Sequence, residues 1–152
     1  MDGIARLEAI EALKQLKARY FLYLDTKDWD CWRDVFADDV EMDVSVHAPP
    51  GADPADHIYH GRDEVVARVS GALVGVVSAH HGHTPIITVE TADSAHGIWA
   101  MEDNLFMPGD MRLLGYGHYH ERYRRIGGDW RIAYTRLARS KVLTMPLAGV
   151  NQ

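Results

Sequence analysis

The chain has 152 residues, of which 47% are hydrophobic, and its formal net charge is −6 at pH 7. This length and apolar content favour one compact domain, spanning residues 1–152, with a continuous core. Acidic and basic residues are interspersed, so the sequence has neither the basic stripe that binds nucleic acid nor the polybasic patch that binds anionic lipid. We therefore expect neither nucleic acid nor a membrane as a partner.

The cellular compartment is predicted from the cysteine content and the N-terminus. Cys31 is the single cysteine and has no intramolecular disulfide partner. The first residues lack the basic and then apolar pattern of a signal peptide, and no apolar run approaches the roughly 20 residues of a membrane span. We expect a soluble protein of the cytoplasm.

A long amphipathic helix is predicted at the N-terminus, because apolar residues recur at three- and four-residue intervals from Ile4 to Leu24. Charged residues, Lys17 among them, fall on the other side of this helix. A second, short helix is expected over 28–36, and alternating apolar residues then predict a strand over 40–46.

The second half of the chain is predicted to be rich in strands. A Pro- and Gly-rich loop over 48–54 precedes a third helix, which opens at Gly61 and runs to about Val77. Four strands follow, at about 84–90, 95–106, 113–126 and 130–141. Helices at the front and long strands behind indicate the α+β class: a strongly curved antiparallel sheet with the helices across its concave face. Residues from the first helix and from the sheet can then converge in the hollow under the helices.

The main candidate for a catalytic site is a cluster of histidines at the boundary between the third helix and the next strand. His80, His81 and His83 lie within four residues, and Asp25 places a lone carboxylate at the end of the apolar face of the first helix. An Asp and a His that meet in an apolar cavity form a general base, because the carboxylate fixes the tautomer of the imidazole and stabilises its protonated form. If the segment is extended, His81 and His83 share one face and His80 lies on the other.

Other readings of these residues stay open. His80 and His83, with Glu102 or Asp103, would make a two-His, one-carboxylate metal set. Their spacing is no recognised ligand motif, so we expect no metal. Asp25 could instead cap the turn at the helix end and face water, and the histidines could bond only to backbone groups.

The later strands carry polar side chains whose direction the sequence leaves open. Strict alternation puts Tyr116, His118, His120 and Arg122 on one face of a strand, and Tyr119, Glu121 and Tyr123 on the other. One set lines the cavity, and the other faces a helix, solvent or another subunit. On the preceding strand Trp99 and Asp103 share a face. An Asp beside apolar residues is costly to bury unless it is paired with another group or has a function. We take Trp99, Asp103 and His118 as candidate substrate contacts.

Four stretches carry a resemblance to a known family: residues 17–25 (KARYFLYLD), 80–85 (HHGHTP), 97–103 (GIWAMED) and 119–130. In them the chain resembles SnoaL-like members of the nuclear transport factor 2 superfamily, and most closely bile acid 7α-dehydratase and scytalone dehydratase-like proteins. The resemblance implies that Tyr20, Asp25 and His80 occupy catalytic positions and that Asp103 occupies an acidic position in the pocket. It implies no metal or organic cofactor. Val44, where the bile acid enzyme has a pocket tyrosine, and a longer loop over 48–56 argue against bile acids as the substrate.

The resemblance also implies a mechanism. His80 would remove a proton from carbon next to a carbonyl, Asp25 would orient the imidazole, and Tyr20 would donate a hydrogen bond to the enolate or the departing hydroxyl. The expected activity is that of a dehydratase or isomerase acting on a hydrophobic cyclic hydroxy-carbonyl compound. The alternative is a non-catalytic small-molecule-binding or interaction module, because a fold does not fix a function. Related dehydratases are trimers and other members are dimers, so we expect a homo-oligomer, trimer or dimer.

Overall fold

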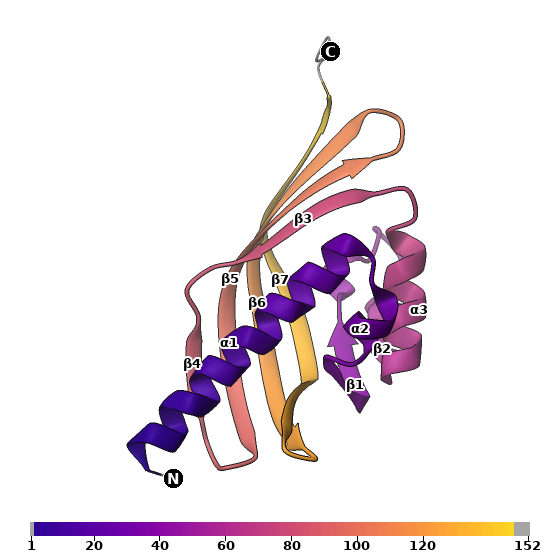
Figure 1. The fold of residues 1–152 in the computed structure, drawn as a ribbon. Coiled ribbons are helices and arrows are strands. Elements are labelled where there is room, and N and C mark those ends of the chain that lie inside the picture. Colours follow the sequence, from indigo (N-terminus) through magenta and orange to yellow (C-terminus); the bar gives the residue numbers. More distant parts are fainter. Residues whose placement is uncertain (1, 148–152) are drawn as a thin grey trace.

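A single curved sheet runs through the molecule, and the N-terminal helix lies diagonally across it (Figure 1). The computed structural model describes residues 2–147. Its elements in chain order are α1 (Gly3–Thr26), α2 (Trp29–Arg33), β1 (Phe36–Asp43), the 3-10 turns η1 (Ser45–His47) and η2 (Pro54–His57), β2 (Ile58–His60), α3 (Arg62–Ala72), β3 (Val77–Gly82), β4 (Ile86–Val89), β5 (Ser94–Met107), β6 (Met111–Ile126) and β7 (Asp129–Pro146).

The strands form one open sheet in the order β2-β1-β7-β6-β5-β3, and β4 pairs with the other half of β5. The long strands β5, β6 and β7 are joined by tight turns and pair antiparallel. The predicted α+β class and curved sheet are confirmed. The sheet is not purely antiparallel, because β1 pairs parallel to β7. This is possible since most of the chain, and no hairpin, connects these two strands.

The strand β3 was not predicted. Residues 73–76 continue the apolar pattern of the helix before them, but α3 ends at Ala72 and Gly75 turns the chain with a φ of 73°. Glycine adopts this backbone conformation without the steric penalty that a Cβ brings. The histidine cluster therefore begins inside a strand at the edge of the sheet, and not at the end of a helix.

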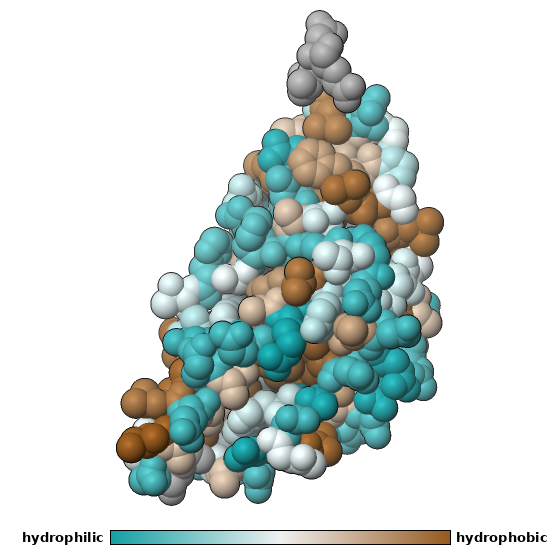
Figure 2. Space-filling model, in the orientation of Figure 1, coloured by the Kyte–Doolittle hydropathy of each residue, from teal (hydrophilic) through white to brown (hydrophobic). Residues whose placement is uncertain are grey.

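The buried face of α1 differs from the predicted apolar stripe at its first turn and at Lys17. Leu13, Leu16 and Tyr20 are buried as expected, whereas Ile4 is 72% exposed because the first turns of α1 extend past the core. Lys17, predicted on the solvent side, is 1% exposed. In Figure 2, apolar side chains are exposed over the N-terminal end of α1 and toward the end of the sheet that carries the C-terminus.

The end of α1 is sharply defined. Lys27 adopts the left-handed conformation with a φ of 60°, its N–H donates to the Leu24 carbonyl at 3.3 Å, and the N–H of Asp28 donates to the Tyr23 carbonyl at 2.9 Å. A residue other than glycine in this conformation costs roughly 1–2 kcal/mol. The turn fixes Asp25 at the last turn of the helix, above β3.

Among residues 2–147, no helix combines the length and the apolar character needed to cross a membrane.

Candidate active site

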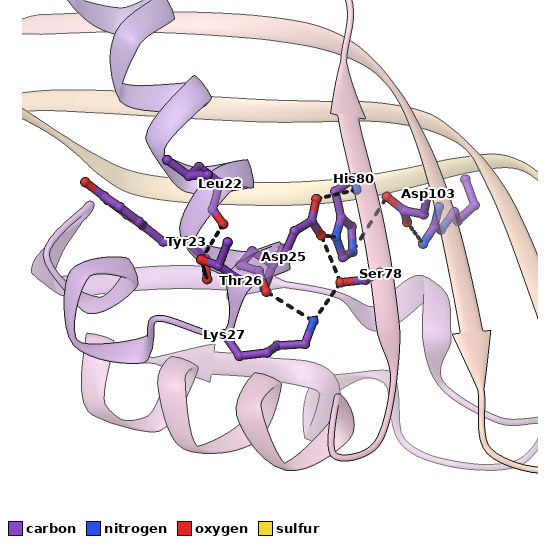
Figure 3. A network of polar contacts seen from close by, with 10 residues as sticks. Leu22, Tyr23, Asp25, Thr26, Lys27, Ser78, His80 and Asp103 are labelled. Atoms are coloured by element: carbon purple, nitrogen blue, oxygen red, sulfur yellow. Dashed lines mark hydrogen bonds and ion pairs between the residues drawn. The ribbon is translucent and has the colours of Figure 1, made fainter.

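Asp25 and His80 meet between the end of α1 and β3 (Figure 3). Asp25 Oδ1 lies 2.6 Å from Nδ1 of His80, and Oδ2 accepts the backbone N–H of the same residue at 2.8 Å. This N–H is available because β3 is an edge strand. Because the Asp25 carboxylate accepts a hydrogen bond from Nδ1, that nitrogen carries a proton. In the neutral imidazole Nε2 then keeps a free lone pair.

The charge on Asp25 is stabilised by its partners. Burial raises the pKa of this carboxyl, but hydrogen bonds from His80 and Ser78 outweigh the burial, so the pKa lies below its usual value. Asp25 is therefore ionised at neutral pH, as a group that orients and stabilises an imidazolium must be.

The His80 side chain, only 8% exposed, lines a cavity of about 400 Å³ under the helices. The cavity wall is mostly apolar and includes Leu24, Met42, Val44, Leu105, Leu113 and Leu137. His47, His57 and Arg68 also line it and bring basic groups. Burial, followed by the charge of Arg139, lowers the pKa of His47. This cavity suits a mostly apolar ligand, whose few polar atoms would contact the polar side chains in the wall.

Asp103 lies next to His80 because the two residues are paired across β3 and β5. Its Oδ1 lies 3.9 Å from Nε2 of His80, and Arg139 of β7 binds Oδ2. The side chains of Asp103 and Arg139 are 3% and 8% exposed. Within residues 2–147, Asp103 Oδ1 and Arg139 Nε are buried without a hydrogen-bond partner. Such groups are costly unless a ligand or a proton satisfies them.

Arg139 was missed by the sequence reasoning, although glycines mark its place. Gly115 pairs with Asp103, and a Cβ at Gly115 would lie 2.2 Å from Nη1 of Arg139. At Gly117 a Cβ would lie 2.0 Å from the carbonyl oxygen of Ala138, next to the irregular pairing of β6 with β7. A glycine inside a strand can mark the close approach of another group, and Gly115 could have pointed to a large side chain there.

Tyr20 and Tyr119 place two phenols in the cavity wall. Burial raises the pKa of Tyr20 far above its usual value, and the nearby carboxylates of Glu121 and Asp103 raise it further. Burial likewise raises the pKa of Tyr119. Both hydroxyls therefore keep their protons and can act as hydrogen-bond donors, which is the role predicted for Tyr20.

Beneath these phenols lies a buried network that was not predicted. Lys17 Nζ lies 2.6 Å from Glu121 Oε1 and 3.7 Å from the ring centroid of Tyr119. The other oxygen of Glu121 accepts the Tyr123 hydroxyl at 2.6 Å, and that hydroxyl accepts Trp99 Nε1 at 2.7 Å. Burial lowers the pKa of Lys17, and Glu121 opposes this shift. The network pairs both buried charges and supports the floor of the cavity.

The structure brings four of the predicted site residues together: Tyr20, Asp25, His80 and Asp103. His118 is on the exposed outer face of β6, so its expected contact with the cavity is corrected. Trp99 is buried, donates to Tyr123 and lines a separate hollow beside residues 80–85, so it does not line this cavity.

The remaining histidines of the cluster lie on the other side of the strand from His80, as alternation predicted. His81 and His83 are more than half exposed and both approach Glu102 on the outer face. A metal set that shares His80 with His83 does not fit this placement.

The open curved sheet with helices across it, and a cavity between the two layers, is the nuclear transport factor 2-like fold. Within it, the chain belongs to the family of the SnoaL-like domain, whose model matches residues 5–136. This confirms the family predicted from the sequence.

Solved structures with the same fold cover the chain almost completely. A hexachlorocyclohexane dehydrochlorinase (LinA type 2) is 19% identical with a TM-score of 0.80, over 99% of this chain and 97% of its own. A putative scytalone dehydratase from Novosphingobium aromaticivorans is 15% identical with a TM-score of 0.81, over 99% of both chains. Rv3472, a protein of unknown function from Mycobacterium tuberculosis, is 25% identical with a TM-score of 0.72, over 89% and 78%.

Proposed function

We propose that this protein is a cofactor-independent dehydratase, with isomerisation as the related alternative, that acts on a hydrophobic cyclic hydroxy-carbonyl compound. The observation that carries the proposal is the Asp25–His80 pair, whose free imidazole nitrogen faces a mostly apolar cavity. A binding module has no need for an ionised carboxylate against an imidazole at such a wall, because burying the charge is costly.

In the proposed reaction each polar group has a role. His80 Nε2 takes the proton from the carbon next to the substrate carbonyl, and Asp25 stabilises the imidazolium that results. Tyr20 donates a hydrogen bond to the oxygen on which negative charge develops. The C–O bond to the hydroxyl then breaks, a C=C bond forms, and Nε2 returns its proton to the hydroxyl, which leaves as water. The enzyme ends in its starting protonation state.

Asp103 and Arg139 contribute beside this pair. The unpartnered Oδ1 of Asp103 lies on the Nε2 side of the ring, where it stabilises the imidazolium and can accept a hydrogen bond from a substrate hydroxyl. Arg139 binds the other oxygen of Asp103 and so holds this side chain in place beside the imidazole. The names of two proteins with this fold, a dehydrochlorinase and a putative dehydratase, both denote eliminations, which is consistent with the proposed chemistry.

The test is turnover of a panel of cyclic hydroxy-ketones, followed by the ultraviolet absorbance of the conjugated product. His80→Ala should lower kcat/KM by about 100-fold or more, as expected for the loss of a general base. Tyr20→Phe should cost less, because it removes one hydrogen-bond donor. His83→Ala, an exposed histidine three residues away, is the matched control and should keep wild-type rates.

Full turnover in His80→Ala would refute the assignment of the base. A product with a moved double bond and no loss of water would indicate the isomerase. Tight binding of the panel without turnover in the wild-type protein would favour the binding module.

A further inference from the structure

The hydrogen bonds at Asp25 continue past the histidine to two residues that the proposed mechanism does not use (Figure 3). Ser78, two residues before His80 on β3, donates its hydroxyl to Asp25 Oδ1 at 2.8 Å. Lys27 Nζ donates to the Ser78 hydroxyl at 2.6 Å and to the Leu24 carbonyl at 3.1 Å. Since the lysine has only donors, the direction of the chain is fixed: Lys27 to Ser78, and Ser78 to Asp25.

The left-handed backbone at Lys27 indicates that the lysine side chain has a role that offsets its unfavourable conformation. The residue terminates α1 in the left-handed conformation, where glycine is the common choice. A lysine is less favourable there, yet this one is half-buried and turned back toward the helix end. Its ammonium is held in place by the Ser78 hydroxyl and the Leu24 carbonyl; burial lowers its pKa and Asp25 opposes the shift.

We infer that Lys27 and Ser78 are positioning residues, which act through Asp25 to keep Nδ1 of His80 protonated and Nε2 free. The catalytic consequence rests on the proposed function, whereas the effect on the imidazole does not.

The electrostatics of the helix end explain why Asp25 needs this support. A carboxylate in the last turn of a helix faces the negative end of the helix dipole. The groups around Asp25 are Tyr20 from the same helix, His80 and Ser78 from β3, and Lys27. In this set Lys27 contributes a positive charge whatever the state of the imidazole. Ser78 also donates to Oδ1, the oxygen that contacts Nδ1, and so helps to hold the carboxylate in place.

Two deletions and two conservative variants separate positioning from folding. Ser78→Ala removes the hydroxyl, and Lys27→Gly removes the ammonium with a residue that suits the left-handed backbone, so the turn should stay intact. Ser78→Thr and Lys27→Arg restore the hydroxyl and the cation. Ser140→Ala and Lys141→Met change exposed residues of the same types on β7 and serve as controls.

The first measurement needs no substrate: the nitrogen-15 chemical shifts of the His80 ring, which report where the proton resides. In the wild-type protein we expect the Nδ1–H form. In Ser78→Ala and Lys27→Gly the share of the Nε2–H form should rise, and the carbon-13 titration of the Asp25 carboxyl should move to higher pH, because the Ser78 hydrogen bond is one cause of its lowered pKa.

The second measurement is kcat/KM. Loss of a hydrogen bond to a charged group corresponds to about tenfold or more, so Ser78→Ala should lose about that factor. Lys27→Gly should lose less, because it acts through Ser78. Arginine at 27 and threonine at 78 should restore most of the rate.

Unchanged ring shifts, an unchanged Asp25 titration and wild-type rates in both deletions would overturn the inference. If Ser78→Ala does not fold, Lys27→Gly alone decides. If the ring and carboxyl respond as expected while the wild-type protein turns over no hydroxy-ketone, the positioning role stands and the proposed function fails.

Discussion

Replacing Lys17 by methionine should destabilise the protein strongly, although the substitution swaps a charged residue for an apolar one inside the core. Lys17 and Glu121 are 1% and 0% exposed, and their charged atoms lie 2.6 Å apart. Without the ammonium, Glu121 keeps hydrogen bonds from Tyr123 at 2.6 Å and from Thr135 at 3.2 Å, but no cation. The carboxylate is then a buried charge without its counter-ion.

Removing one partner of a buried ion pair costs about 3–5 kcal/mol. For a chain of this size each kcal/mol shifts Tm by about 2–4 °C, so Lys17→Met should lower Tm by about 6–20 °C. Replacing the whole pair, as in Lys17→Met with Glu121→Gln, should restore stability close to the wild-type value, because neutral replacements of buried pairs are often nearly neutral in energy. Met lacks a charge and Gln can still accept from Tyr123.

The assay is urea unfolding at pH 7, followed by circular dichroism. The free energies of unfolding of the single and double variants are compared provided that their m-values are equal. Lys14→Met, an exposed lysine one turn earlier in α1, is the control and should change the free energy of unfolding by less than about 0.5 kcal/mol. A loss below about 1 kcal/mol in Lys17→Met, or a double variant no more stable than the single one, would refute the view that the pair stabilises the cavity floor as a unit.

Asp25 has a pKa below its usual value in the folded protein, and this has a consequence for stability in acid. Such a carboxyl stabilises the fold at pH values above its unfolded-state pKa. That contribution is lost as the pH falls through the folded-state pKa. The difference in free energy of unfolding between wild type and Asp25→Asn, measured by urea unfolding, should therefore be largest near pH 7 and shrink on acidification toward pH 3. A difference that does not change with pH would contradict the conclusion that the Asp25 carboxylate is ionised. We also predict a homo-oligomer, trimer or dimer, because apolar side chains such as Ile4, Phe106 and Leu143 are exposed, and light scattering that gives a mass of one chain would contradict this.

Local patterns were enough to predict most of the framework. The three- and four-residue spacing of apolar residues predicted α1, and alternation predicted the long strands, because each periodicity reflects the geometry of its own element. Alternation also predicted that His80 faces away from His81 and His83, which the exposed fractions of these side chains bear out. Boundaries were less certain where apolar residues continued beyond an element, as between α3 and β3.

The sequence by itself determined the α+β class and the residues whose chemistry suits a general base, since these follow from residue types at short spacing. It indicated the family through the resemblance of four of its stretches. Only the tertiary structure decided which face of β6 is inside, that Lys17 is buried, and that Arg139 joins Asp103. Those facts depend on the register between strands and on what packs opposite each side chain, and such partners are more than 30 residues away along the chain in both the Lys17–Glu121 and the Arg139–Asp103 pair. Gly115 marks a close approach to β6, but no local pattern names the partner, because a side chain becomes buried through the neighbours that folding brings to it.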